Sequence, residues 1–221
     1  VMRYPANRGK FCLAAALMLA VATLLPRIVN ASTEQQWRFT VHLDDTPIGH
    51  HDFSVQQLEG YEKVTTEARF DVSFLKIPLF KYRHQDVQFW SDQCLKSINS
   101  TTDQNGKLFR VDGSTTTNGF QVSANGDDIT LPPCISTFAY WDKSFLQHSH
   151  LLNSQTGEYL EIDVEDLGEH SIPLSDTSLP AKRYRLTAKE LDIELWYSSD
   201  GRWLGLESTT GNGRLLRYVI E

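Results

Sequence analysis

The chain has 221 residues, with 28 acidic against 21 basic side chains and a formal net charge of −7 at neutral pH. Four of the basic residues lie before residue 32, so the rest of the chain carries 17 basic and 28 acidic residues, a net charge of −11. Such an acidic surface repels phosphate groups, which argues against nucleic acid as a partner.

The first 31 residues have the three parts of a secretory signal peptide. A short basic segment precedes the apolar run 11–25, and small residues follow at Val29 and Ala31. The apolar run has 15 residues, fewer than the roughly 18 expected of a membrane-spanning helix. We therefore predict cleavage after Ala31, no transmembrane anchor in the mature protein, and a periplasmic or secreted location.

The mature part, residues 32–221, is predicted to be a single β-rich domain. In "WRFTVHL" the residues Trp37, Phe39, Val41 and Leu43 share one face, and polar residues share the other. The same alternation recurs in "RFDVSF", "YLEIDVED" and "LDIELWY". One apolar and one polar face per strand are typical of an antiparallel sheet that is packed on one side.

Turn signals separate these runs. They include Asn105-Gly106, Asn125-Gly126, Asp200-Gly201 and Gly211-Asn212-Gly213. Asn-Gly and Asp-Gly pairs tolerate the positive φ of tight hairpins, so consecutive strands are expected to be neighbours. We predict a mainly β fold: a single curved antiparallel meander sheet of about ten strands, forming a half-open barrel.

The stretch "LPPCISTFAYWDKSFLQHSHLL", residues 131–152, breaks the alternation. Pro132 and Pro133 end the preceding strand, and Ser136 or Thr137 can cap a helix. Apolar side chains and one histidine then recur at spacings of three and four: Phe138, Trp141, Phe145, His148 and Leu152. This stripe predicts one short internal helix near 137–152, packed against the concave face of the sheet.

Cys94 and Cys134 are the two cysteines of the mature chain, and in an oxidising compartment they are predicted to form a disulfide. The alternative is a thiol nucleophile at Cys134. His148 is too far along a continuous helix to serve as its base, so a more distant histidine, such as His84 or His170, would be needed. The spacings of the histidines do not suit a metal site, and neither metal nor cofactor is expected.

A curved sheet with one helix often leaves space on its concave side, where aromatic residues can line an apolar pocket. The candidate ligand-binding residues are Trp90, Phe138, Tyr140, Trp141, Phe145 and His148. The predicted partner is a lipid or other apolar small molecule, or an envelope protein. Three hypotheses follow: a non-catalytic binding domain, a thiol enzyme of the envelope, and a structural or interaction protein with a filled core.

Several segments resemble an uncharacterised exported family of Gram-negative bacteria, a periplasmic domain of unknown function. They are "WRFTVHLDDTPIGHHDF", "CLKSINSTTDQNGK", "PPCISTFAYWD" and "LWYSSDGRWLGLES". The resemblance covers nearly all of the mature chain and implies no catalytic residue, because the family has no assigned activity. The expected architecture is also distantly similar to that of periplasmic lipoprotein carriers, half-open barrels that hold acyl chains.

Overall fold

The computed structural model describes residues 1–2, 33–74, 77–174 and 177–221. The predicted signal peptide, apart from its first two residues, lies outside these ranges. From Thr33 onward the described residues form one compact unit. None of the helices in the described ranges has the length and apolar character needed to cross a membrane.

Strands account for most of this unit. The first group comprises β1 (Glu34–Leu43), β2 (Thr46–Leu58), β3 (Tyr61–Phe74), β4 (Ile77–Ser91), β5 (Cys94–Gln104), β6 (Lys107–Thr116), β7 (Gly119–Ala124) and β8 (Asp127–Leu131). The second group comprises β11 (Asp163–Leu174), β12 (Thr177–Ala188), β13 (Leu191–Tyr197), β14 (Trp203–Thr209) and β15 (Leu215–Ile220).

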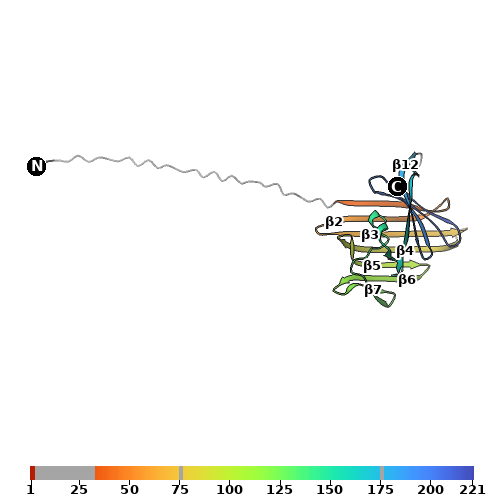
Figure 1. Cartoon of the computed structure of the whole chain (residues 1–221), viewed down its shortest axis with the longest axis horizontal. Coiled ribbons are helices and arrows are strands. Elements are labelled where there is room, and N and C mark those ends of the chain that lie inside the picture. Colours follow the sequence, from red (N-terminus) through yellow and green to blue (C-terminus); the bar gives the residue numbers. More distant parts are fainter. Residues whose placement is uncertain (3–32, 75–76, 175–176) are drawn as a thin grey trace. The chain divides into compact units, whose positions relative to one another are not determined.

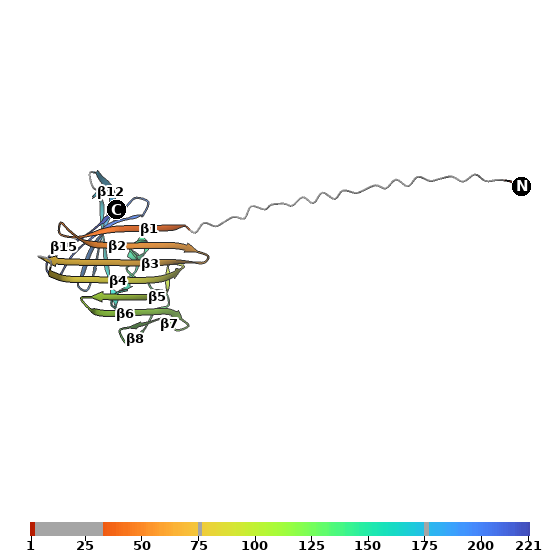
Figure 2. The same ribbon diagram turned by 180° about the vertical axis from the view of Figure 1, so that it is seen from behind.

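All thirteen of these strands belong to one antiparallel sheet in the order β11-β12-β13-β14-β15-β1-β2-β3-β4-β5-β6-β7-β8. Each group is a meander, and β15 pairs with β1 to join the two groups. Figures 1 and 2 show β2 to β7 stacked in order, with the C-terminal strands crossing them steeply. The sheet does not close, because β8 and β11 remain as its edges. The predicted half-open antiparallel meander is confirmed.

The described residues contain fifteen strands, more than the ten or so predicted. The additional ones are short: β7 and β8 have six and five residues, and two strands between β8 and β11 have three each. Such strands contain too few apolar residues to show alternation in the sequence.

Local sequence explains the hairpins. In β1 the alternating residues Trp37, Phe39, Val41 and Leu43 are buried, as predicted. Asn105 and Gly106 connect β5 to β6 with φ angles of 54° and 86°, and Asn125-Gly126 connects β7 to β8 with positive φ at both residues. Positive φ at both central residues gives a two-residue turn whose twist matches that of the strands.

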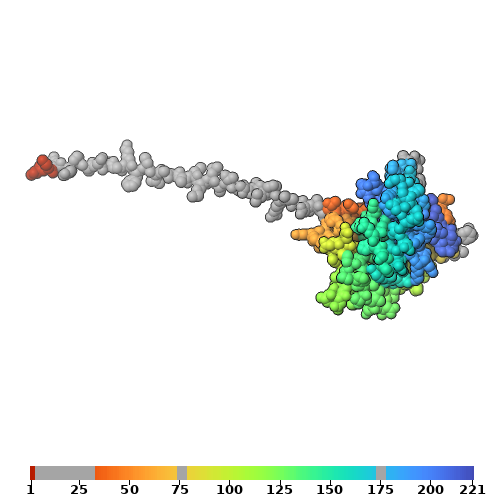
Figure 3. Space-filling view, in the orientation of Figure 1, coloured from red at the N-terminus to blue at the C-terminus, as the bar shows by residue number. Residues whose placement is uncertain are grey.

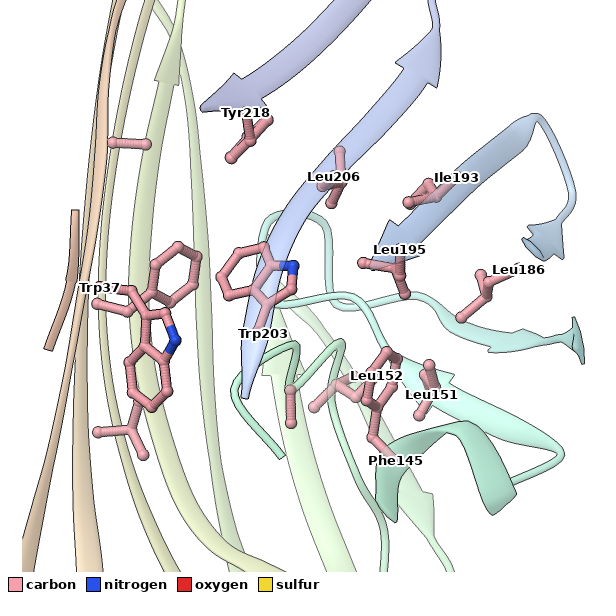
Figure 4. Packing of buried hydrophobic residues seen from close by; sticks show 14 of the residues in the cluster. Trp37, Phe145, Leu151, Leu152, Leu186, Ile193, Leu195, Trp203, Leu206 and Tyr218 are labelled. Atoms are coloured by element: carbon pink, nitrogen blue, oxygen red, sulfur yellow. The ribbon is translucent and has the colours of Figure 1, made fainter. Parts of the chain in front are cut away.

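The sheet curves until its two halves share one core. The ring of Trp203 on β14 lies 4.4 Å from that of Phe39 on β1 and 5.0 Å from that of Phe53 on β2, measured between centroids. In Figure 4, Trp37 of β1, Trp203 and Phe145 point into the same cluster. This end of the concave side is therefore filled by side chains.

Residues 132–162 connect the two edges of the sheet, and we call them the crossing segment. The segment contains the 3-10 helix η1 (Lys143–Gln147) and a two-stranded sheet of β9 (His150–Leu152) and β10 (Tyr159–Glu161). Its residues Ile135, Phe145, Leu151 and Leu152 are almost fully buried in the core. Figure 3 shows the green to cyan residues of this part of the chain across the near side of the unit.

The helix predicted near 137–152 is much shorter than expected. Only Lys143–Gln147 is helical, and Asp142, not Ser136 or Thr137, caps it by accepting from Ser144 N. Thr137 instead forms a parallel bridge with Leu152, whose N–H donates to Ser136 O. Phe138, Trp141 and Phe145 all pack in or against the core, although only Phe145 lies in the helix. Apolar residues at spacings of three and four therefore do not require a helix in this segment.

The predicted disulfide between Cys94 and Cys134 is confirmed, with an S–S distance of 1.95 Å. Beside it, Leu95 N donates to Ile135 O at 3.0 Å. The start of the crossing segment is therefore attached to β5 by a covalent bond and a backbone hydrogen bond. A disulfide of this kind is typical of proteins that fold outside the cytoplasm.

Candidate ligand-binding site

Strand β4 carries three polar side chains on the concave face of the sheet, where its neighbours carry mainly apolar ones. His84, Asp86 and Gln88, which we call the polar row, are each at most 3% exposed. Tyr82 and Trp90 continue the same face of β4 on either side and are also buried. Buried polar groups are costly unless they form hydrogen bonds, so the partners of the polar row decide what it can do.

Trp90 fixes the orientation of Gln88. The indole Nε1–H can only donate, and it lies 3.0 Å from Gln88 Oε1, which also accepts from the Thr137 hydroxyl at 3.1 Å. The amide nitrogen of Gln88 must then face the other way, and it donates to Asp86 Oδ2 at 2.6 Å. Asp86 Oδ2 is therefore an acceptor in this network.

Asp86 keeps one oxygen without a hydrogen bond. Across the described residues its buried Oδ1 has no partner at hydrogen-bond distance and angle, although the Ser154 side chain lies close enough to act on the carboxyl. Burial raises the pKa of Asp86 to about 7, and the side chains of Gln88 and Ser154 oppose that rise in part. Because Oδ2 accepts from Gln88, the proton of the neutral acid belongs on Oδ1, which is then a hydrogen-bond donor without an acceptor.

Two buried histidines accompany Asp86. His84 Nδ1 lies 2.9 Å from the Thr102 hydroxyl, and its Nε2 lies 4.0 Å from Asp86 Oδ2. His51 of β2 pairs through Nδ1 with the Tyr218 hydroxyl at 3.1 Å, whereas its Nε2 has no partner within the described ranges. Burial lowers the pKa of His84 to about 4, and burial together with His84 lowers the pKa of His51 well below its ordinary value. Both imidazoles are therefore neutral at neutral pH.

The polar row faces a cavity of about 130 Å³, which we call the polar cavity. Strands β2 to β4 form one wall, and β13 and the crossing segment form the others. Its lining includes His51, His84, Asp86, Gln88, Phe138, Tyr140, Trp141, Gln155 and Leu191. It thus combines hydrogen-bonding groups with aromatic walls.

A larger groove of about 750 Å³ adjoins the polar cavity, and we call it the apolar groove. Its apolar and aromatic lining includes Ile48, Phe70, Val72, Leu79, Phe80, Tyr82, Leu216 and Tyr218. Polar side chains line it as well, namely Gln104, Glu190, Ser208, Thr209, Thr210, Asn212 and Arg214. His51, Gln155 and Leu191 line both spaces. The two spaces therefore meet at these three residues.

A third space of about 460 Å³, the end cavity, lies at the tips of the β2–β3 and β4–β5 hairpins. Trp90, Trp141 and Phe145 line it together with the acidic residues Glu62, Asp92 and Asp142. Trp141 also lines the polar cavity, so the end cavity and the polar cavity are adjacent.

The candidate pocket residues predicted from the sequence divide between these spaces. Phe138, Tyr140 and Trp141 line the polar cavity, and Trp90 and Phe145 line only the end cavity. His148 is half-buried at the C-terminus of η1 and lines none of the three spaces. Ligand binding by these residues stays a prediction.

The disulfide removes the free thiol that the enzyme hypothesis requires, because Cys134 is bonded to Cys94. Across the described ranges, no three His, Cys, Asp or Glu side chains are grouped closely enough to hold a metal ion.

The sequence prediction did not identify the polar row or His51 as residues that line a cavity. A signal was present in β4, "FKYRHQDVQFW", where both faces of the strand carry polar residues between aromatic ends. In a sheet with one packed side, such a strand must turn one of its polar faces inward.

One solved structure is similar in fold. It is the crystal structure of a beta-barrel-like protein of the domain of unknown function DUF1849 from Brucella abortus, with a TM-score of 0.60 and 10% sequence identity over 85% of this chain and 94% of that chain. At this identity the likeness concerns the fold alone. No curated protein matches the sequence. The family model described as Domain of unknown function (DUF6134) matches residues 39–221, and the chain therefore belongs to that family.

Proposed function

We propose that this chain is a non-catalytic binding protein of the cell envelope that holds an amphiphilic, lipid-like molecule. The apolar part of the ligand lies in the apolar groove, and its polar end reaches the polar cavity. The observation that carries this proposal is that the two spaces are adjacent, because His51, Gln155 and Leu191 line both of them. An apolar space beside a buried polar one matches the two ends of an amphiphile.

The size and walls of the apolar groove suit an alkyl chain. Its volume of about 750 Å³ lies within the range of small-molecule sites, about 300–1,000 Å³. Phe70, Tyr82 and Phe80 are stacked along it, with centroid distances of 5.2 and 6.4 Å between successive rings. Leu79, at 61% exposure, lines the same groove. Burial of an alkyl chain on such walls contributes about 0.8 kcal/mol per methylene.

Two further observations support an envelope location. The N-terminal residues have the composition of a signal peptide, and the Cys94–Cys134 disulfide suits an oxidising compartment such as the periplasm. The half-open sheet with a segment across its concave side is also similar in architecture to carriers of acyl chains, although fold alone does not assign function.

The apolar groove also distinguishes this proposal from the hypothesis of a filled core. Trp203, Phe39 and Phe53 fill one end of the concave side, whereas the walls around Val72 and Phe80 enclose a groove. A protein that acts only as a scaffold does not need such a groove.

Titration with the neutral fluorescent probe N-phenyl-1-naphthylamine tests the proposal. Phe80→Asp places a charge in the apolar groove, and we expect it to weaken probe binding at least about tenfold, because a carboxylate there must be desolvated by the ligand. Leu79→Asp acts at an exposed position of the groove and is expected to have a smaller effect of the same sign.

Leu108→Asp is the matched control. Leu108 on β6 is 59% exposed, much like Leu79, but it does not line the groove. We expect the control to bind the probe as the wild type does, and near-UV circular dichroism checks that each variant is folded. Equal binding by the folded Phe80→Asp variant and the wild type, or no binding by the wild type, would reject the proposal.

A further inference from the structure

We propose that the polar end of the ligand is an uncharged group with both a hydrogen-bond donor and an acceptor, such as a hydroxyl or a primary amide, and that it binds at Asp86 and His51. This inference rests on the proposed function and adds the chemical class of the ligand. Its basis is that Asp86 and His51 both line the polar cavity beside the apolar groove, and that each has one buried polar atom without a partner among the described residues.

The first of these atoms is Asp86 Oδ1. The chain of hydrogen bonds from Trp90 Nε1 through Gln88 fixes Asp86 Oδ2 as an acceptor, so the neutral acid carries its proton on Oδ1. A ligand oxygen that accepts from Oδ1–H removes the cost of a buried donor without a partner, about 1–3 kcal/mol.

The second atom is His51 Nε2. The neutral imidazole has one N–H, and its position depends on whether Nδ1 donates to the Tyr218 hydroxyl or accepts from it. Nε2 is therefore an acceptor in the first case and a donor in the second. A hydroxyl or an amide can meet either form, because each of these groups both donates and accepts.

A charged group fits this cavity poorly. Of the described residues that line it, none is Lys or Arg, so a carboxylate or phosphate finds no counter-charge. His51 and His84 are neutral at neutral pH, because burial lowers the pKa of each imidazole. An ammonium group would need the ionised form of Asp86, which is the minor form at a pH below its pKa of about 7. Burying that ion pair also costs several kcal/mol unless every remaining polar atom is satisfied.

The size of the polar cavity agrees with this assignment. About 130 Å³ is enough for a small polar group but not for an alkyl chain, which the apolar groove holds instead. Aromatic side chains of the crossing segment, Phe138, Tyr140 and Trp141, form a wall of the polar cavity. They keep bulk water away from the hydrogen bonds to Asp86 and His51, which strengthens those bonds.

Displacement of N-phenyl-1-naphthylamine by ligands of one chain length tests the inference on residues 32–221 at pH 6, where Asp86, with a pKa of about 7, is mostly protonated. The ligands are lauryl alcohol, lauramide, lauric acid and laurylamine. We expect the alcohol and the amide to bind at least about tenfold more tightly than the acid and the amine. Tightest binding of the acid or the amine, or equal binding of all four, overturns the inference while the proposed function stands. A wild-type protein that binds neither probe nor ligand overturns both.

Two substitutions at Asp86 locate the hydrogen bond. Asp86→Asn can place an N–H in the position of Oδ1–H while its oxygen still accepts from Gln88, so the preference for the alcohol and the amide is expected to remain. Asp86→Leu removes the donor, and the affinity for lauryl alcohol is expected to fall about tenfold while the probe still binds. An unchanged affinity of the folded Asp86→Leu variant for the alcohol contradicts the assignment. If that variant does not fold, the wild-type series alone decides.

Discussion

Strands β1 and β4 belong to the same sheet and face the same concave side, yet they carry opposite chemistry. The inward residues of β1 are apolar and pack against Trp203 of the other half of the sheet. Those at the centre of β4 are the polar row, which lies beneath the crossing segment and beside a cavity. The comparison teaches that one alternating pattern forms either a core or a binding site, depending on what covers it.

The largest expected effect is on β1. Phe39→Ala removes a fully buried ring that contacts Trp203, Phe53 and Tyr218. We expect the free energy of unfolding to fall by about 3–5 kcal/mol, measured by urea denaturation. Phe109→Ala is the control, because that ring is only half-buried on β6. If both variants lose the same stability, β1 has no special role in the core.

We expect the disulfide to stabilise the crossing segment, which lies over the polar row of β4, more than it stabilises β1. Replacing both Cys94 and Cys134 with Ser opens a loop of 40 residues and is expected to cost about 4 kcal/mol if chain entropy dominates. Hydrogen exchange should then rise more in residues 132–162 than in β1, as mass spectrometry of peptides can show. Equal increases in both regions would mean that the bond does not anchor the crossing segment.

A smaller effect is expected from the pH dependence of Asp86. Its pKa is about 7 in the folded protein, against an ordinary value of 3.8. As the pH falls from about 8 toward 4, the folded state therefore binds a proton before the unfolded state does, and stability rises. Over this range we expect the wild type to gain about 2–4 kcal/mol relative to Asp86→Asn, which lacks the titrating group.

His84 acts in the opposite direction, because its pKa falls from 6.5 to about 4 on folding. As the pH falls from 6.5 to about 4, the unfolded state binds a proton at His84 before the folded state does, so the free energy of unfolding decreases. Wild type and Asp86→Asn share this loss, so the difference between their unfolding free energies, measured in urea at each pH, isolates Asp86. A constant difference across the range would contradict the buried carboxyl.

The smallest effect is expected on the convex face. Arg38 on β1 forms an ion pair with Asp52 at 3.2 Å, and both side chains are largely exposed to solvent. Arg38→Ala is expected to change the unfolding free energy by less than about 1 kcal/mol, within the same denaturation series. A loss comparable to that of Phe39→Ala would show that the two faces of β1 do not differ in the way described.

Much of the fold was predictable because its signals are local. The alternation in β1 and the Asn105-Gly106 turn depend on neighbouring residues, and Cys94 and Cys134 are the only two cysteines after residue 31. The pairing of β15 with β1 has no local signal. The crossing segment was predicted to be a longer helix, because side chains such as Phe138 and Trp141 pack against the core at helical spacing although they lie outside η1.

The candidate site was less predictable than the fold. Aromatic clustering pointed to the crossing segment, where Phe138, Tyr140 and Trp141 line the polar cavity. His51 and Asp86 have no motif that brings them together. Their proximity depends on strand register and on the curvature of the sheet, which are properties of the whole domain.

The seam between β1 and β15 has a consequence for how the molecule is made. Thr40 donates to Glu221, which lies 181 positions later in the chain. Each half of the sheet consists of consecutive hairpins that can form early, but closing the seam requires the slow encounter of distant segments. Until the seam forms, β1 therefore has an unpaired edge, and a chain that stalls at this stage of folding exposes that edge to other molecules.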